Sequence, residues 1–220
     1  MMRKVWVYNI TGLLLVLSVW IYFRQKNDNR VRTIAEKVQN PANKRAIDSC
    51  IAMLHTGDIV LRTGNDVTSN MFCRANTQDK TYSHTGFVIV EDGHPFIYHS
   101  IGGEDNPDEV LRRDSATRWF SPAHNNGLGI SRFPLTAEEI DSAVAIASRY
   151  YHGKKKFDLD FDLSNDDKLY CTEFIYKVLN NATRDTAYIK PTKRLGYTYI
   201  AVDNISRSPH ATLICQIRYK

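Results

Sequence analysis

Three residues of the sequence carry the side chains that acyl transfer through a thiol requires: Cys171, His84 and His99. Apolar residues recur at positions 171, 174, 175 and 178, and this spacing predicts a helix that begins near Cys171. A thiol in the first turn of a helix meets backbone N–H groups and the positive end of the helix dipole, which both favour the thiolate. We therefore expect Cys171 to act as a nucleophile.

The two histidines flank a predicted hairpin. His84 stands just before a strand over Phe87–Val90, and His99 closes a strand over Pro95–His99, with Asp92-Gly93 as the turn between them. A tight hairpin brings the distant ends of its strands together, so the two imidazoles are expected to be neighbours. One of them could then deprotonate the thiol while the other orients its ring.

The elements around these residues predict an α+β fold in which helices pack against an antiparallel sheet. Ile47, Cys50, Ile51 and Leu54 have helical spacing, and Ile59 begins a buried strand. A capping box of Thr136 and Glu139 opens a helix that stops near Gly153. Further strands are expected over Leu128–Phe133 and in the segments TYIAV and ATLICQIRY.

Four segments carry a resemblance to a known family. They are GDIVLRT (57–63), YSHTGFVIV (82–90), FIYHSIGG (96–103) and KFDLDFDLSNDDKLYCTEFIYKVL (156–179). Together they resemble the NlpC-like, circularly permuted papain-fold cysteine hydrolases of the YiiX/YebB type. The resemblance covers roughly residues 56–199, and its most specific piece is the acidic loop followed by YCTEF.

The resemblance implies a permuted papain-like fold and a site that needs no cofactor or metal. It implies Cys171 as the nucleophile and His84 as the base, with the backbone N–H of Cys171 as an oxyanion donor. The third polar position of the family is often a glutamate, whereas this chain has His99 there. The related retinol-acyltransferase-like branch also uses a histidine in that role.

Three classes of function remain open. The first is a thiol hydrolase that cleaves an amide, such as that of a cell-wall peptide, or an ester through an acyl-enzyme on Cys171. The second is a lipid-directed acyltransferase, thioesterase or amidase with the same dyad, so the expected partner is a peptide or a lipid-like acyl substrate. The third is a non-catalytic binding module or zinc site, because two imidazoles and a thiolate are adequate zinc ligands.

Two other features bear on the site. Glu173 lies two residues after Cys171 and is expected to be a charge on the helix surface. Residues 62–82 and 102–127 are expected to be long connections that form the walls of a cleft. Trp119 and Phe120 fall in the second connection, where they could line a groove or pack in the core.

The composition is typical of a globular protein and does not indicate a nucleic-acid partner. Hydrophobic residues make up 43% and charged residues 24% of the 220 residues. The net charge is +5, but the basic residues are scattered and no nucleic-acid motif accompanies them, so no nucleic-acid partner is expected. The 4 cysteines are widely spaced without a CxxC pair, which excludes a zinc ribbon and a dense disulfide scaffold but allows a single disulfide.

The N-terminal segment predicts a membrane anchor. Residues from Val5 to Phe23 are uncharged, with aromatic residues near both ends, and they lack the small residues of a cleavage site. We expect an uncleaved transmembrane signal anchor over residues 1–26, a linker over 27–45 and a hydrolase domain over 46–220. The flanking basic residues slightly favour a cytoplasmic domain, whereas the resemblance implies a periplasmic or extracytoplasmic one.

Overall fold

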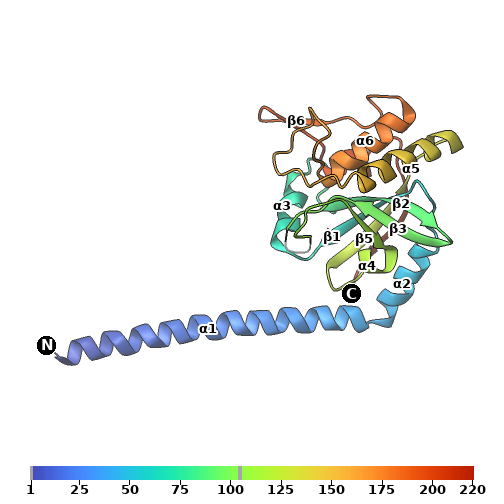
Figure 1. Cartoon of the computed structure of the whole chain (residues 1–220). Helices are drawn as coiled ribbons and strands as arrows, with labels where there is room; N and C mark the ends of the chain where they lie inside the picture. The colour runs from blue at the N-terminus through green and yellow to red at the C-terminus, as the bar shows by residue number, and fades with distance from the viewer. Residues whose placement is uncertain (1, 104–105) are drawn as a thin grey trace.

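A six-stranded antiparallel sheet of strand order β4-β3-β2-β1-β5-β8 forms the centre of the molecule (Figure 1). The structure is a computed structural model that describes residues 2–103 and 106–220, with side-chain surroundings from residue 16 onward. The strands are β1 (Ile59–Gly64), β2 (His84–Glu91), β3 (His94–His99), β4 (Arg112–Ser115), β5 (Asn125–Arg132) and β8 (Thr212–Arg218), and a separate hairpin joins β6 (Thr192–Arg194) to β7 (Tyr197–Tyr199). The predicted α+β architecture agrees with this arrangement.

The hairpin of β2 and β3 forms as predicted. Asp92 and Gly93 have φ values of 49° and 78°, which is the left-handed conformation that a two-residue hairpin turn requires. The register pairs Glu91 with His94 next to the turn and ends at the pair Phe87 and Tyr98. The first residues of β2, at the end away from the turn, therefore extend past the last residue pair that β2 forms with β3.

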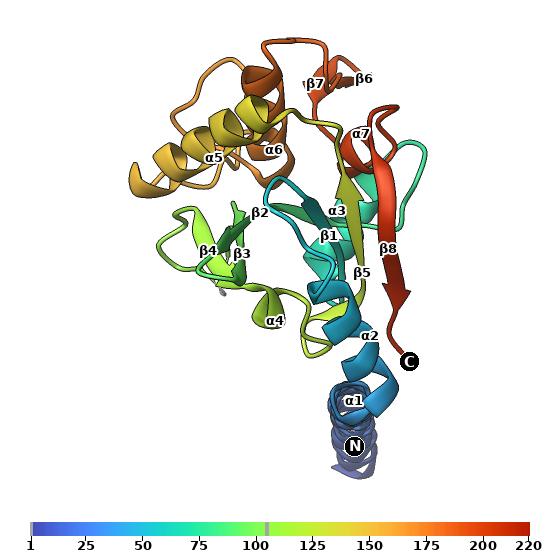
Figure 2. The same cartoon turned by 90° about the vertical axis from the view of Figure 1, so that its right-hand side faces the viewer.

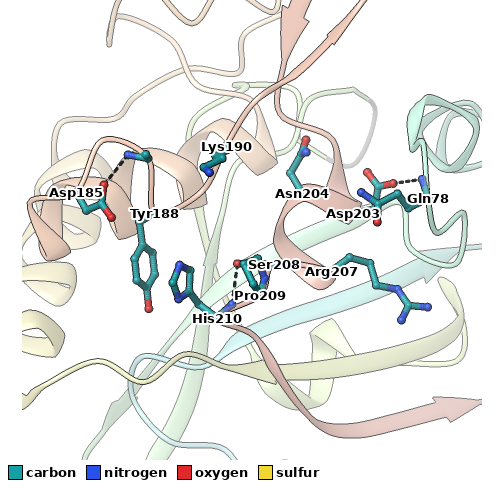
Figure 3. Close-up of a pocket in the computed structure, with 11 residues that line it drawn as sticks. Gln78, Asp185, Tyr188, Lys190, Asp203, Asn204, Arg207, Ser208, Pro209 and His210 are labelled. Atoms are coloured by element: carbon teal, nitrogen blue, oxygen red, sulfur yellow. Dashed lines mark hydrogen bonds between the residues drawn. The ribbon is translucent and has the colours of Figure 1, made fainter.

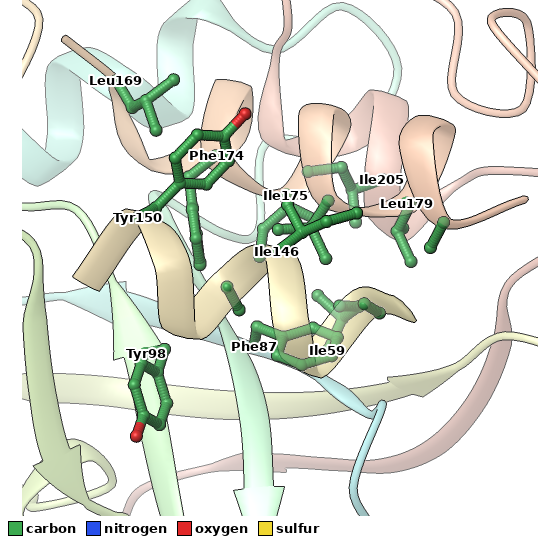
Figure 4. Packing of buried hydrophobic residues seen from close by; sticks show 14 of the residues in the cluster. Ile59, Phe87, Tyr98, Ile146, Tyr150, Leu169, Phe174, Ile175, Leu179 and Ile205 are labelled. Carbon is green, nitrogen blue, oxygen red and sulfur yellow. The ribbon is translucent and has the colours of Figure 1, made fainter. Parts of the chain in front are cut away.

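Helices cover both faces of the sheet (Figures 1 and 2). On one face, α5 (Ala137–His152) and α6 (Cys171–Thr183) bury a core that includes Phe87 and Phe174 (Figure 4). On the other face, α2 (Pro41–Ile51) and the short α4 (Ala116–Trp119) pack against β-strand side chains. The predicted capping box of Thr136 and Glu139 starts α5.

The two stretches expected to be long connections contain regular structure. The first holds α3 (Val67–Ala75), which Asp66 caps by accepting a hydrogen bond from the N–H of Ser69. The second holds β4 and α4, and Trp119 is fully buried in the core beside α2. These elements are short, so their periodicity is too weak to predict them, and α7 (Val202–Ser206) was missed for the same reason.

A disulfide joins Cys50 on α2 to Cys215 on β8, across a sequence separation of 165 residues. Cys73 and Cys171 are free thiols. The disulfide therefore ties the C-terminal edge strand to the N-terminal part of the folded domain.

The prediction of a transmembrane helix, and of a protein held in a membrane by a single span, is wrong. In the part of the chain that the structure describes, no helix is long and apolar enough to cross a membrane. The segment belongs to α1 (Met2–Gln39), a helix of 38 residues that continues from the apolar run into a polar, charged half (Figure 1). The side chains of residues 5–15 lie outside the described ones.

Candidate active site

His84 and His99 are hydrogen-bonded to each other, as the hairpin geometry predicts. The Nε2 atom of His84 lies 3.1 Å from Nδ1 of His99, and both rings are buried. On its other side, Nε2 of His99 lies 3.2 Å from Oδ2 of Asp114 on β4. Asp114 was missed because β4 is short and polar and only its pairing with β3 brings the carboxylate to the histidines.

The ionisation of Asp114 determines which atoms donate and which accept along this hydrogen-bond chain. Hydrogen bonding to His99 and the charges of nearby arginines lower the pKa of Asp114 to about 2 despite its partial burial, so at neutral pH the carboxylate only accepts. His99 must then donate from Nε2, which leaves a lone pair on Nδ1 that accepts the Nε2–H of His84. A neutral His84 in this arrangement carries its own lone pair on Nδ1.

Both imidazoles are neutral at pH 7. Burial is the main cause that lowers the pKa of His84 well below its ordinary value and the pKa of His99 to about 4. The positive charge of Arg62 lowers both pKa values further. The contact between His99 and Asp114 is consequently a hydrogen bond to a carboxylate and not an ion pair.

An indole holds the two imidazoles in place. The ring of Trp119 is stacked on His84, with the ring centroids 5.1 Å apart, and meets His99 edge-on at 4.5 Å. The guanidinium carbon of Arg62 lies 4.4 Å from the centroid of the same indole. Trp119 and Arg62 are therefore part of the site, although neither carries a motif that would reveal this in the sequence.

Cys171 begins α6, as predicted, and its side chain is only 5% exposed. Hydrogen bonding from the backbone N–H groups of Thr172 and Thr85 lowers the pKa of the Cys171 thiol. Thr85 follows His84 directly and lies beyond the last pair of the β2–β3 ladder. The structure describes both Cys171 and His84, and no hydrogen bond joins the sulfur of Cys171 to the ring of His84.

The helix start favours the thiolate as expected, but burial of Cys171 outweighs this effect. The N–H groups of Thr172 and Thr85 and the charge of Arg62 do lower the pKa of Cys171. Burial acts in the opposite direction and is the largest effect, so the pKa is raised to about 11. The resting side chain is therefore a neutral thiol.

Glu173 is fully buried and is not the surface charge that its position suggested. Its Oε2 accepts a hydrogen bond from the N–H of Tyr170 at the start of α6, and Oε1 lies 3.2 Å from Nζ of Lys177. Lys177 in turn binds Asp166 in the acidic loop. Burial raises the pKa of Glu173 to about 7. The carboxyl group thus helps to hold the start of the helix that carries Cys171.

A pocket of about 470 Å³ opens beside Cys171. Its walls come from α3, from the loop before α6 and from the β6–β7 hairpin. Of the two stretches expected to form cleft walls, only the first contributes residues to it. The cleft is therefore walled by the β6–β7 hairpin in place of the second stretch.

A second pocket, of about 340 Å³, lies away from the predicted site residues (Figure 3). Charged side chains of both signs line it, among them Asp185, Lys190 and Arg207, and the rings of Tyr188 and His210 stack there with centroids 4.3 Å apart. None of the predicted catalytic residues lines this pocket, so we do not include it in the candidate site.

The fold and the site define an α+β protein with a cysteine at the start of α6 and a buried His–His–Asp hydrogen-bond chain on the sheet. No protein-family model matches the sequence. The curated protein YiiX of Escherichia coli K12, which is uncharacterized, is 26% identical over 129 residues, and the match spans 58% of this chain and 58% of YiiX. The chain is therefore similar to YiiX over a little more than half of either protein.

The structural comparison agrees with the sequence comparison. The crystal structure of YiiX from Escherichia coli O157:H7, described as a metalloprotein, matches with a TM-score of 0.61 and 21% identity. The match covers 74% of this chain and 98% of that one. At this level of identity the likeness shows the fold alone.

The description of that relative raises the question of whether this site fits a metal ion. Among the residues that the structure describes, no three His, Cys, Asp or Glu side chains are grouped so that they could hold one. His84 and His99 bind each other, and the outer nitrogen of His99 binds Asp114. The donor set does not fit a metal centre, and we derive no step through one.

Proposed function

We propose that the protein is a cysteine hydrolase that cleaves an amide or ester bond through a thioester on Cys171. The observation that carries the proposal is the directed hydrogen-bond chain from Asp114 through His99 to His84, which leaves an unprotonated lone pair on Nδ1 of His84. Hydrogen bonding from the backbone N–H of Thr85, the next residue along β2, lowers the pKa of the Cys171 thiol. This relation of Thr85 to Cys171 supports the pairing of His84 with Cys171 in the proposal.

The finer assignment to the permuted papain-like, NlpC-like hydrolases is part of this proposal. Two features support it. The nucleophile begins a helix that packs on an antiparallel sheet, and both histidines precede the cysteine in the chain. The resemblance of the four sequence segments points to the same class.

In the proposed acylation step, the sulfur of Cys171 attacks the carbonyl carbon of the substrate, and the thiol proton passes to Nδ1 of His84. An S–C bond forms, and the bond from carbon to the leaving nitrogen or oxygen breaks as His84 returns the proton to that atom. Water then attacks the thioester and gives a proton to His84. The S–C bond breaks, the sulfur regains a proton, and a carboxylic acid leaves.

The resting geometry sets one requirement for this reaction. Because no hydrogen bond joins the sulfur of Cys171 to the His84 ring in the resting structure, this contact must form before the proton moves. The backbone N–H of Cys171 is the proposed donor to the developing oxyanion. Both partners start neutral, so deprotonation of the thiol is a step in the reaction and not a property of the resting state.

The first test is acyl-enzyme formation with p-nitrophenyl esters and p-nitroanilides, followed by intact mass and by release of the chromophore. We expect the wild type to form an adduct on Cys171 and to turn over, and Cys171→Ala to lose both while keeping its fold. Cys73→Ala, which removes the other free thiol, is the matched control and should keep full activity. Turnover by Cys171→Ala, or no adduct with any substrate in the wild type, would overturn the proposal.

The second test addresses the hydrogen-bond chain. Asp114→Asn replaces an obligate acceptor with an amide that can also donate, so His99 loses its fixed tautomer, and we expect kcat/KM to fall about 10- to 100-fold. Arg118 binds the same carboxylate at 3.5 Å from a 62% exposed position, and Arg118→Gln should change kcat/KM less than about fivefold. Equal losses in the two variants would show that only the charge near Asp114 matters and not the direction of the chain.

A further inference from the structure

The pocket beside Cys171 is lined mainly by apolar side chains. Three aromatic rings form one wall, with centroids 6.1 Å apart between Phe72 and Phe161 and 5.0 Å apart between Phe161 and Tyr170. Ile200 and Val202 contribute to the same pocket. A wall of this kind removes apolar groups of a ligand from water, and it offers few hydrogen-bond partners to the polar groups of that ligand.

Buried polar side chains on the wall are already used within the protein. Asn76 donates to the carbonyl of Tyr82 and accepts from the N–H of Val202. The hydroxyl of Thr172 donates to the carbonyl of Ile200. A peptide bound here would lose hydrogen bonds to water without finding these partners free, so the inner pocket disfavours peptide ligands.

The rim of the pocket exposes apolar residues in unfavourable backbone conformations. Leu195, at the tip of the β6–β7 hairpin, is 87% exposed with φ of 51°, and Tyr197 is 74% exposed. The tight turn at this tip favours Asn or Gly at the position of Leu195, on grounds of both conformation and solubility. Phe161 on the opposite side also has a positive φ, of 55°. Folding alone does not favour bulky apolar residues at these two positions.

We propose that the pocket holds an aliphatic acyl chain, so that the substrate class is long-chain acyl esters or amides. This inference rests on the proposed function for the carbonyl group, which would lie at Cys171, while the chain would lie against Phe72 and Phe161 and under the hairpin tip. Binding of the chain covers Leu195 and Tyr197 and so accounts for their exposure in the free protein. The contiguity of the apolar wall with the nucleophile is the observation that selects this ligand.

The experiment compares alkylation by N-decyl iodoacetamide and by iodoacetamide at about pH 9, with peptide mapping that separates Cys171 from Cys73. Each buried methylene raises affinity roughly threefold to fourfold, so a chain with only a few methylenes in the pocket should react at least about tenfold faster at Cys171. Cys73, half-exposed and outside the pocket lining, is the internal control and should show no such preference.

A pair of surface variants tests the rim. Leu195→Asp should reduce the preference of Cys171 for the decyl reagent at least about threefold. Leu213→Asp, at a 57% exposed leucine that does not line the pocket, should leave it unchanged. Equal reaction of Cys171 with the two reagents, or an unchanged preference in Leu195→Asp, would overturn the inference.

The alkylation needs only the sulfur and the pocket, and not His84 or a leaving group. A decyl preference without hydrolysis of any substrate would therefore refute the proposed function alone. Hydrolysis that is indifferent to chain length, together with equal alkylation by both reagents, would refute only the acyl-chain pocket.

Discussion

At the scale of single residues, the environment of Cys171 is set by two opposing effects. Backbone N–H groups of Thr172 and Thr85 stabilise negative charge on the sulfur, whereas burial penalises it more strongly. The histidines experience the same penalty for their positive charge. A buried site therefore keeps the thiol and both imidazoles neutral, and an ion pair of thiolate and imidazolium is not its resting state.

This protonation state predicts the pH dependence of thiol modification. Only the thiolate reacts with iodoacetamide, and a pKa raised to about 11 keeps the thiol protonated throughout the neutral range. The alkylation rate of Cys171, followed by peptide mapping, should thus rise about tenfold per pH unit from about pH 7 to about pH 10. A rate that levels off below about pH 8 would instead indicate a thiolate–imidazolium pair and would contradict this assignment.

At the scale of elements, α6 is held at its start by a buried carboxyl group. Glu173 accepts the N–H of Tyr170 and lies beside Lys177, which extends the contact to Asp166 in the acidic loop. These contacts connect the first turn of α6, and with it Cys171, to the loop that supplies Phe161 to the pocket. The acidic loop and the nucleophile are consequently positioned together.

Removing this carboxyl group should weaken the fold measurably. Glu173→Ala leaves the N–H of Tyr170 and the ammonium of Lys177 without their buried acceptor, and we expect the free energy of unfolding to fall by about 1–3 kcal/mol in urea denaturation. Glu173→Gln keeps an acceptor for the N–H and should lose less. Glu138→Ala, at an exposed position of the first turn of α5, should change stability by less than about 0.5 kcal/mol. A loss in Glu173→Ala no larger than in this control would disprove the role of Glu173.

At the scale of the whole molecule, the disulfide between Cys50 and Cys215 joins two distant parts of the chain. It fastens β8, an edge strand of the sheet, to α2 on the face that also holds Trp119. A cross-link over 165 residues restricts the unfolded chain strongly, and so favours the folded state.

The double variant Cys50→Ala/Cys215→Ala should lower the free energy of unfolding by about 2–4 kcal/mol, measured by urea denaturation followed through tryptophan fluorescence. A reducing agent should destabilise the wild type by a similar amount and leave the double variant unchanged. Cys73→Ala should respond to reduction as the wild type does. If reduction releases no additional thiols from the wild type, the disulfide is absent in solution.

Local patterns in the sequence determined a large part of the framework. The capping box before α5, the apolar spacing of α6 and the Asp92-Gly93 turn each act within a few residues, so they place Cys171 at a helix start and predict that His84 and His99 are neighbours. The N-terminal apolar run was misleading, because it forms part of a longer helix whose second half is polar. Sequence similarity to one family added the candidate roles of the cysteine and the histidines.

Only the tertiary structure decided which further groups meet at the site and what charge they carry. Arg62 comes from β1, Asp114 and Trp119 come from the consecutive β4 and α4, and no spacing in the sequence relates them to His84. The protonation of Cys171 and the burial of Glu173 were likewise mispredicted from position alone. The physical reason is that desolvation depends on how distant segments pack around a group, whereas helix caps, turns and periodicity depend on the nearest neighbours in the chain.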